Sequence, residues 1–253
     1  MEDLSGGLKP LALIELIAAS PSAATLVELA QAAGVPKSTA HRWLGALEAA
    51  GLVQRTLDGR HFELAPRASA LAVSILTNGP SSLMRREILR GIVDRVGEAC
   101  NLTVLSGTHV TYMDRVESTW PLRISFQAGS IVPTYCSASG KLFLALMRAS
   151  KRDLILTVTT FERHTGKTIT DKGDLLRELK DIRANGYALD REEFMSGLVC
   201  LAVPVFRAKA QTRECIAALA LQAPVSRMTH DVLLKHLPLL QKSAEEIAAT
   251  VGE

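Results

Sequence analysis

Cysteine is scarce in this 253-residue sequence, and its spacing forms no recognisable pattern. The four cysteines lie far apart and include no C-x-x-C pair; they are Cys100, Cys136, Cys200 and Cys215. Reduced thiols that are buried as small hydrophobic side chains fit this spacing better than disulfides or a zinc site. We therefore expect no bound metal, and no motif in the sequence indicates a cofactor.

Long apolar runs and a recognisable secretory leader are also lacking. No run approaches the roughly 18 apolar residues that a membrane span needs. Residues 1–9 show no basic stretch followed by an apolar one and a cleavage site. We expect a cytoplasmic protein without a membrane segment. A large excess of one charge is also missing, because the formal net charge is only +3. This slightly basic balance permits nucleic-acid binding without demonstrating it.

The first 65 residues predict a winged helix-turn-helix. Thr25 and Glu28 form a Thr-x-x-Glu capping box at the start of one helix, and Gly34 supplies the residue that leaves it. A second helix follows after a tight turn and ends at Gly51. The predicted helices of this part are residues 10–19, 26–33 and 36–50.

Two short strands after these helices predict the wing. Asp58-Gly59 is a strong signal for a two-residue hairpin turn, and it lies between strand-like runs at 52–54 and 60–64. A wing beside a helix-turn-helix is typical of DNA-binding domains.

The second helix of the pair carries short polar and cationic side chains on its first turns, as a helix in the DNA major groove requires. A solvated helix end without a specific role is the alternative for such a helix taken alone. The capping box, the glycine turn and the wing favour DNA binding. The predicted DNA-binding residues are Lys37, Ser38, Thr39, His41 and Arg42 on the helix, with Arg55 and Arg60 on the wing.

The charge of this first part argues against a simple electrostatic attraction to DNA. Residues 1–65 contain five Lys and Arg against seven Asp and Glu. Because phosphate neutralisation supplies much of the affinity for DNA, one copy should bind weakly. Two copies on adjacent half-sites would multiply the contacts, so we expect an oligomer.

The rest of the chain predicts a linker helix over 66–80 and a second domain over 81–253. The break is the Asn-Gly-Pro-Ser segment at 78–81. Helices and strands alternate irregularly, with one long antiparallel sheet, so the fold class is α+β and not a doubly wound sheet. We expect Arg85 on the outward face of the first helix and a single closing helix over 230–250. The predicted strands are residues 101–105, 110–116, 122–127, 198–206 and 215–222, and the other helices are residues 83–99, 138–147, 151–158 and 172–185.

Three stretches of the sequence resemble the IclR family of bacterial transcriptional regulators. The first runs from 29 to 53, the second is 133–145 and the third is 186–205. They occur in the order of the family and span nearly the whole chain. The resemblance implies a GAF-like effector-binding domain after the DNA-binding domain, a small organic acid as effector, and homodimers or homotetramers bound to a double-stranded DNA operator.

The stretch Cys-Ser-Ala-Ser-Gly-Lys at 136–141 predicts a helix start whose first N–H groups have no partner within the helix. Together with the helix dipole, such an end suits a carboxylate. Ordinary N-capping by Ser137 or Ser139 is the alternative, and only the resemblance favours a ligand. The resemblance implies an effector pocket formed by Ile124, Val132, Ala138, Ser139, Asp190, Leu198, Cys200 and Gln222. At the last of these positions the family commonly has a small or hydroxyl-bearing residue.

Catalytic motifs are not found. A phosphate-binding loop around Gly140-Lys141 would need Gly in place of Tyr135 and Ser or Thr in place of Leu142. No Gly-x-Ser-x-Gly elbow is present, and the histidines have neither catalytic nor metal-ligand spacing. We expect no enzyme. Two alternatives stay open, namely a regulator whose second domain only oligomerises and a hydrolase-like domain fused to a DNA-binding module.

Overall fold

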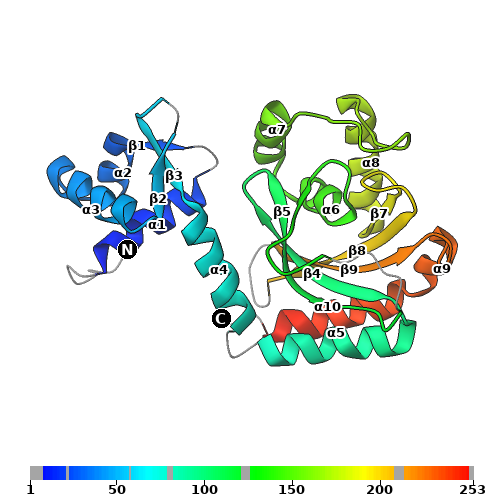
Figure 1. Cartoon of the computed structure of the whole chain (residues 1–253). Coiled ribbons are helices and arrows are strands. Elements are labelled where there is room, and N and C mark those ends of the chain that lie inside the picture. The colour runs from blue at the N-terminus through cyan, green and yellow to red at the C-terminus, as the bar shows by residue number, and fades with distance from the viewer. Residues whose placement is uncertain are drawn as a thin grey trace. The chain divides into compact units, whose positions relative to one another are not determined.

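The computed structural model describes residues 8–20, 23–56, 58–78, 82–120, 126–207 and 214–250. The chain divides into two compact units, Met1–Ile75 and Leu76–Glu253, and each is described by itself (Figure 1). The division falls within α4 (Pro66–Asn78), in the segment for which the sequence predicted a linker helix. None of the helices in the described ranges has the length and apolar character needed to cross a bilayer.

The N-terminal unit contains a helix-turn-helix and a small antiparallel sheet of strand order β1-β3-β2. A core of Leu13, Leu29, Leu44 and Phe62 holds the helices on the sheet. The elements before α4 are α1 (Lys9–Ala19), β1 (Ala24–Thr25), α2 (Leu26–Ala32), α3 (Lys37–Ala49), β2 (Val53–Arg55) and β3 (His61–Leu64).

Local signals in the sequence account for the start and end of α2. The hydroxyl of Thr25 accepts a hydrogen bond from the Glu28 backbone N–H, and the Glu28 carboxylate accepts one from the Thr25 N–H at 2.8 Å. This is the predicted capping box. Gly34 then adopts a φ of 65°, a left-handed conformation that glycine takes without a steric penalty. The helix-turn-helix prediction is confirmed.

The wing is present, but its turn is longer than the two residues predicted. Arg55 pairs with Phe62, and the Thr56 N–H donates to the His61 carbonyl, so the loop lies between Thr56 and His61. The carboxylate of Asp58 accepts hydrogen bonds from the Thr56 hydroxyl at 2.6 Å and from the Arg60 N–H at 2.8 Å. These side-chain bonds stabilise a longer loop in place of a tight hairpin turn.

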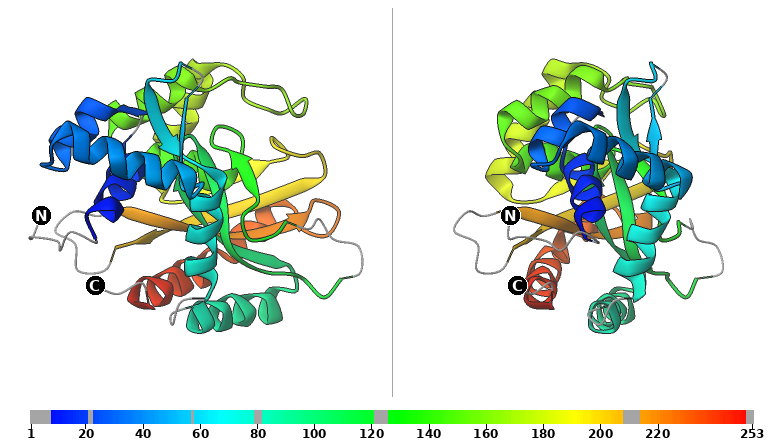
Figure 2. Two further views of the ribbon diagram at one scale, coloured as in Figure 1. Left: turned by 60° about the vertical axis from the view of Figure 1, so that its left-hand side comes forward. Right: turned by 90° about the vertical axis from the view of Figure 1, so that its left-hand side faces the viewer.

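The C-terminal unit is built on a six-stranded antiparallel sheet of order β6-β5-β4-β9-β8-β7. This confirms the predicted α+β class. Helices α5 (Ser82–Val96) and α10 (Leu237–Thr250) cover one face, and α6 (Ala138–Leu146) covers the other (Figures 1 and 2). The strands are β4 (Ala99–Ser106), β5 (His109–Val116), β6 (Ile131–Pro133), β7 (Ala188–Arg191), β8 (Leu198–Phe206) and β9 (Cys215–Pro224).

The two faces of this sheet carry different side chains. The face under α5 and α10 presents large apolar residues such as Leu102, Leu201 and Leu219. The face under α6 includes Ala202 and Ala220, whose small side chains allow α6 to lie close to the sheet. The remaining helices on the α6 side are α7 (Ala149–Val158) and α8 (Lys172–Asn185) (Figure 1).

Two predictions for the helices of this unit were wrong. Arg85 is only 6% exposed, because it shares the sheet-facing side of α5 with Leu89 and Ile92. Burial disfavours the charge of Arg85, and the negative charge of Asp114 favours it. The single closing helix is divided into α9 (His230–Lys235) and α10. Pro238 has no N–H for a helical hydrogen bond and belongs in the first turn of a new helix. The strand predicted at 122–127 lies largely outside the described residues.

Candidate DNA-binding and effector sites

Helix α3 presents the predicted DNA-binding residues on one exposed face. Lys37, Ser38, His41 and Arg42 are exposed and Thr39 is half-buried. The opposite side packs on the core through Ala40, Leu44 and Leu47. A helix anchored on one side, with cations and short hydrogen-bonding groups on the other, has the layout of a recognition helix.

The two predicted wing arginines differ in their contacts. The Arg55 guanidinium donates to the Gly59 carbonyl at 3.1 Å and lies 4.6 Å from the centroid of the Phe62 ring. Arg55 therefore contributes to the shape of the wing. Arg60 is exposed, and its side chain has no partner among the described residues. Of the two, Arg60 is the arginine that is available for a phosphate.

In the C-terminal unit, six of the eight predicted effector residues line one small cavity at the start of α6. The volume of this cavity is about 20 Å³, which is space for roughly one water molecule. Residues that the sequence did not predict also contribute, among them Asn101, Thr103 and Tyr112. The six predicted lining residues are Val132, Ala138, Ser139, Asp190, Cys200 and Gln222.

The start of α6 is fixed by Ser137 and by a close backbone contact. The Ser137 hydroxyl accepts from the Gly140 N–H at 3.2 Å and donates to the Pro133 carbonyl, so Ser137 is the N-cap. The first helical bond runs from the Lys141 N–H to the Ser137 carbonyl. The N–H groups of Ala138 and Ser139 precede this bond, and the helix provides no acceptor for them.

Glycine is required at position 140. A Cβ atom there would lie 2.3 Å from the carbonyl oxygen of Thr134, which is far inside van der Waals contact. The helix start can therefore lie against the segment after β6 only with glycine at this position.

Three of the cavity residues form one row across neighbouring strands. Asp190 of β7 pairs with Cys200 of β8, and Cys200 pairs with Gln222 of β9. The Asp190 carboxylate accepts from the Glu193 N–H at 2.7 Å. Burial raises the pKa of Asp190 to about 7, so this carboxyl group is partly protonated near neutral pH.

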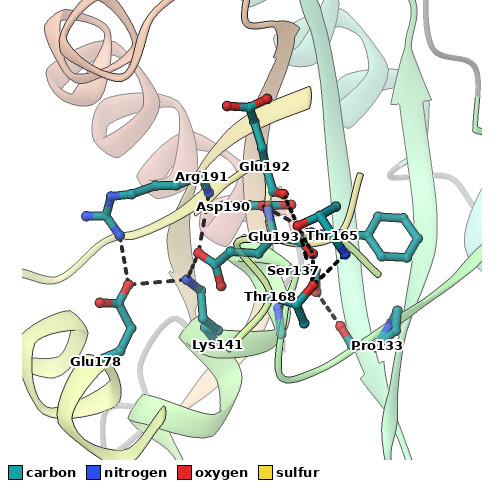
Figure 3. Close-up of polar contacts among 12 residues, drawn as sticks. Pro133, Ser137, Lys141, Thr165, Thr168, Glu178, Asp190, Arg191, Glu192 and Glu193 are labelled. Carbon is teal, nitrogen blue, oxygen red and sulfur yellow. Dashed lines mark hydrogen bonds and ion pairs between the residues drawn. The ribbon is translucent and has the colours of Figure 1, made fainter. Parts of the chain in front are cut away.

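A buried ion-pair network, not predicted from the sequence, lies beside Asp190 (Figure 3). Lys141 is 0% exposed, and its Nζ is 2.5 Å from an oxygen of Glu193 and 3.2 Å from one of Glu178. Arg191 donates to the same Glu178 oxygen at 3.0 Å. The network joins α6, α8 and the segment after β7. A lysine within an apolar helix requires an acidic partner, and the Glu-Glu pair at 192–193 was the available signal.

A second buried cation, Arg115, lies next to the cavity. Its guanidinium donates to the side-chain carbonyl of Gln222 at 2.5 Å and pairs with Glu117 at 2.7 Å. Leu198, which was predicted for the pocket, is buried but lines a neighbouring hollow with Arg115 and Gln222, so the prediction for Leu198 is not supported. Ile124 lies outside the described residues.

Nucleophilic chemistry is not favoured by the thiol that precedes the start of α6. Cys136 is completely buried, and burial raises its pKa to about 12. A thiol with this pKa stays protonated at neutral pH and is a poor nucleophile. Within the described ranges, no three His, Cys, Asp or Glu side chains group as metal ligands.

Comparisons with known proteins agree with both units. Residues 9–57 match the IclR helix-turn-helix domain, and residues 82–249 match the C-terminal domain of the bacterial transcriptional regulator IclR. The "Probable transcriptional regulator SauR" of Cupriavidus necator is 40% identical over 241 residues, which cover 95% of this chain and 94% of that protein. This relative and the matched family are described as regulators of transcription.

Solved structures show the same architecture. The crystal structure of Thermotoga maritima IclR has a TM-score of 0.65 at 26% identity and covers 97% of this chain and 98% of that chain. The inducer-binding domain of a double mutant of PobR from Acinetobacter, in complex with 3-hydroxybenzoic acid, has a TM-score of 0.60 at 26% identity. It covers 65% of this chain and 95% of that chain.

The helix-turn-helix with its exposed polar face, the α+β unit that follows it in the sequence and the matches to both family domains lead to one conclusion. The chain belongs to the IclR family of bacterial transcriptional regulators, with a DNA-binding helix-turn-helix domain and a C-terminal ligand-binding domain.

Proposed function

We propose that this regulator acts in the cytoplasm as a homodimer or homotetramer whose operator binding changes when a small organic acid binds at the start of α6. The observation that carries the proposal is the small buried cavity there. It combines two N–H groups that the helix leaves without an acceptor with polar side chains of the sheet. The complex of the PobR inducer-binding domain with 3-hydroxybenzoic acid supports an acid as the class of ligand.

The anion is expected at Ala138 and Ser139. The partial positive charge of a helix N-terminus favours a carboxylate, and a ligand can reach the backbone beside small side chains. Asp190 lies in the same cavity, and its raised pKa lowers the repulsion between two carboxylates, because part of the population is neutral near pH 7.

The volume of the cavity requires the site to change shape when an acid binds. A volume of about 20 Å³ is too small for an organic acid, so binding must enlarge the site. An effector that favours the enlarged state shifts the protein toward it, and this coupling can alter operator binding. A surface hollow of about 610 Å³ lies elsewhere in the unit, around Arg183 and Gln241, and it serves as the competing location.

The experiment is a fluorescence titration of operator DNA, taken from upstream of the gene, with and without a panel of aliphatic and aromatic carboxylic acids. The wild type is compared with Ala138→Val, whose added methyl groups occupy the cavity, and with Gln241→Ala at the larger hollow. We expect an acid to change the DNA affinity of the wild type and of Gln241→Ala, but not that of Ala138→Val. Loss of the response in Gln241→Ala alone would place the effector in the larger hollow.

The same panel of acids separates the alternatives when the melting temperature and the recovery of each acid are measured as well. If no acid changes the melting temperature or the DNA affinity, the C-terminal domain only oligomerises. If the acid is bound and also consumed, as measured by its recovery after incubation, the domain is an enzyme.

For the DNA site, Lys37→Ala and Arg42→Ala should weaken operator binding without lowering the melting temperature, because both side chains are exposed. Loss of a base contact costs about 1 to 3 kcal/mol of binding free energy. Loss of a phosphate contact lowers the slope of log affinity against log salt concentration by about one in magnitude. Arg60→Ala should weaken specific and non-specific binding alike, as expected for a phosphate contact. Unchanged DNA affinity in all three variants would contradict the assignment.

A further inference from the structure

Asn101 is an anomaly in the wall of the cavity. This residue is 1% exposed, and neither the Nδ2 nor the Oδ1 atom of its side chain has a hydrogen-bond partner among the described residues. Buried amides nearly always have partners, because an unpaired buried polar group destabilises the fold. A residue that keeps an unpaired amide in a cavity is expected to have a functional role.

The neighbours of Asn101 explain why its amide has no partner in the protein. Asn101 pairs with Ala220 on β9 and with Arg115 on β5. The side chain of Ala220 has no polar atom, and the Arg115 guanidinium donates its hydrogen bonds to Gln222 and Glu117. Thr103, two residues further along β4 in the same cavity, donates its hydroxyl to the Ala218 carbonyl. Asn101 is therefore the unpaired polar side chain in this part of the wall.

The donor and acceptor atoms of an amide define which ligand group would pair with both of them. Its oxygen needs a donor and its nitrogen needs an acceptor. A keto oxygen or a second carboxylate only accepts hydrogen bonds and would leave the Asn101 oxygen unpaired. A hydroxyl group both donates and accepts, and it is the smallest group that does so, which suits a cavity of about 20 Å³.

We propose that Asn101 selects the effector by hydrogen bonding to a hydroxyl group, so that the ligand is a short hydroxy acid. The carboxylate lies at the start of α6, and the hydroxyl group lies against the sheet at Asn101. This inference rests on the effector site of the proposed function and adds the class of ligand and the residue that distinguishes it.

The test measures binding to the full-length protein by calorimetry with matched acids. The panel consists of propionate, 2-hydroxypropionate, 3-hydroxypropionate, pyruvate and malonate, with benzoate and 3-hydroxybenzoate as an aromatic pair. We expect one hydroxy acid to bind about 10- to 100-fold more tightly than its unsubstituted and keto counterparts, because only the hydroxy acid pairs both atoms of the buried amide.

Two variants of Asn101 and one matched control complete the design. Asn101→Leu has the same branching and number of heavy side-chain atoms without polar groups, and Asn101→Ala only truncates the side chain; both should lose the preference for the hydroxyl group. Thr134→Val removes a buried hydroxyl that is already paired with the Thr108 carbonyl and does not line the cavity, so it should keep the preference. Without ligand, Asn101→Leu should raise the melting temperature by about 2 to 4 °C, because it removes an unpaired buried amide.

Each outcome is decisive. Equal binding of hydroxylated and unsubstituted acids by the wild type, or tightest binding of pyruvate or malonate, overturns the role of Asn101 and leaves the proposed function intact. A preference for the hydroxyl group that persists in both Asn101 variants also overturns it, and so does a lower melting temperature of Asn101→Leu. If none of these acids binds, the inference fails, and the proposed function is decided separately by the response of DNA affinity to the wider panel of acids.

Discussion

Removal of the buried cation Lys141 tests how the effector cavity is held together. In Lys141→Met the new side chain has similar length but no charge, so Glu193 keeps its carboxylate in the interior without its ion-pair partner at 2.5 Å. Glu178 is more exposed and retains Arg191. Breaking a buried ion pair at one partner costs about 3 to 5 kcal/mol. For a unit of this size, that cost corresponds to a melting temperature lower by roughly 10 °C.

The pH dependence of this loss follows from Glu193. Burial already raises the pKa of Glu193, and Lys141 opposes the rise. Without Lys141 the pKa of Glu193 rises further, so lowering the pH protonates more of Glu193 and leaves less buried charge uncompensated. The destabilisation should therefore be smaller at pH 5 than at pH 8.

The assay is urea unfolding of the wild type, Lys141→Met, Glu193→Gln and the double variant at both pH values. The double variant should recover most of the loss, since it has no unpaired buried charge, and the coupling energy should reach about 2 kcal/mol or more. A loss below about 1 kcal/mol, or additive effects of the two substitutions, would refute the role of the network.

The remaining predictions concern the helix start and Asp190. Gly140→Ala should lower the stability by about 1 to 3 kcal/mol and abolish the acid response, because its Cβ collides with the backbone of Thr134. Gly91→Ala, in open space on α5, is the control and should stabilise by about 0.5 to 1 kcal/mol; equal effects in urea unfolding would contradict the collision. The Asp190 pKa is raised from 3.8 to about 7, so the folded state holds a proton that the unfolded state releases, and stability is lost as pH rises from about 4 to 7. Asp190→Asn should abolish this loss, which reaches up to about 4 kcal/mol; parallel stability curves for the variant and the wild type from pH 5 to 8 would show that the shift is absent.

The N-terminal unit could be predicted from the sequence because its signals are local. The capping box at Thr25 and the glycine at position 34 each determine the backbone within a few residues. The error in the wing is also confined to a few residues. The Asp-Gly pair indicated a tight turn, but the Asp58 side chain forms bonds that stabilise a longer loop.

The candidate effector site could be predicted only in part. Ala138, Ser139 and Cys200 lie in stretches that resemble the family, and the structure brings them to one cavity. Whether they bind an acid stays a prediction. Asn101 and Arg115 were missed because their role depends on β4 lying beside β9, with β5 next to β4 in the sheet; the β4–β9 pairing joins segments more than 100 residues apart. No local pattern predicts such a neighbour.

Separate recognition of the two ends of the ligand has a consequence for how new specificities arise in such a site. At the α6 end the proposed contact is to backbone N–H groups, which every substitution except one by proline leaves in place. At the sheet end the contacts come from side chains, among them Asn101 and Gln222. Under this arrangement a single codon change on the sheet alters the preferred acid while affinity for acids as a class is retained. An evolving lineage could therefore acquire a new inducer in small steps without rebuilding its operator-binding domain.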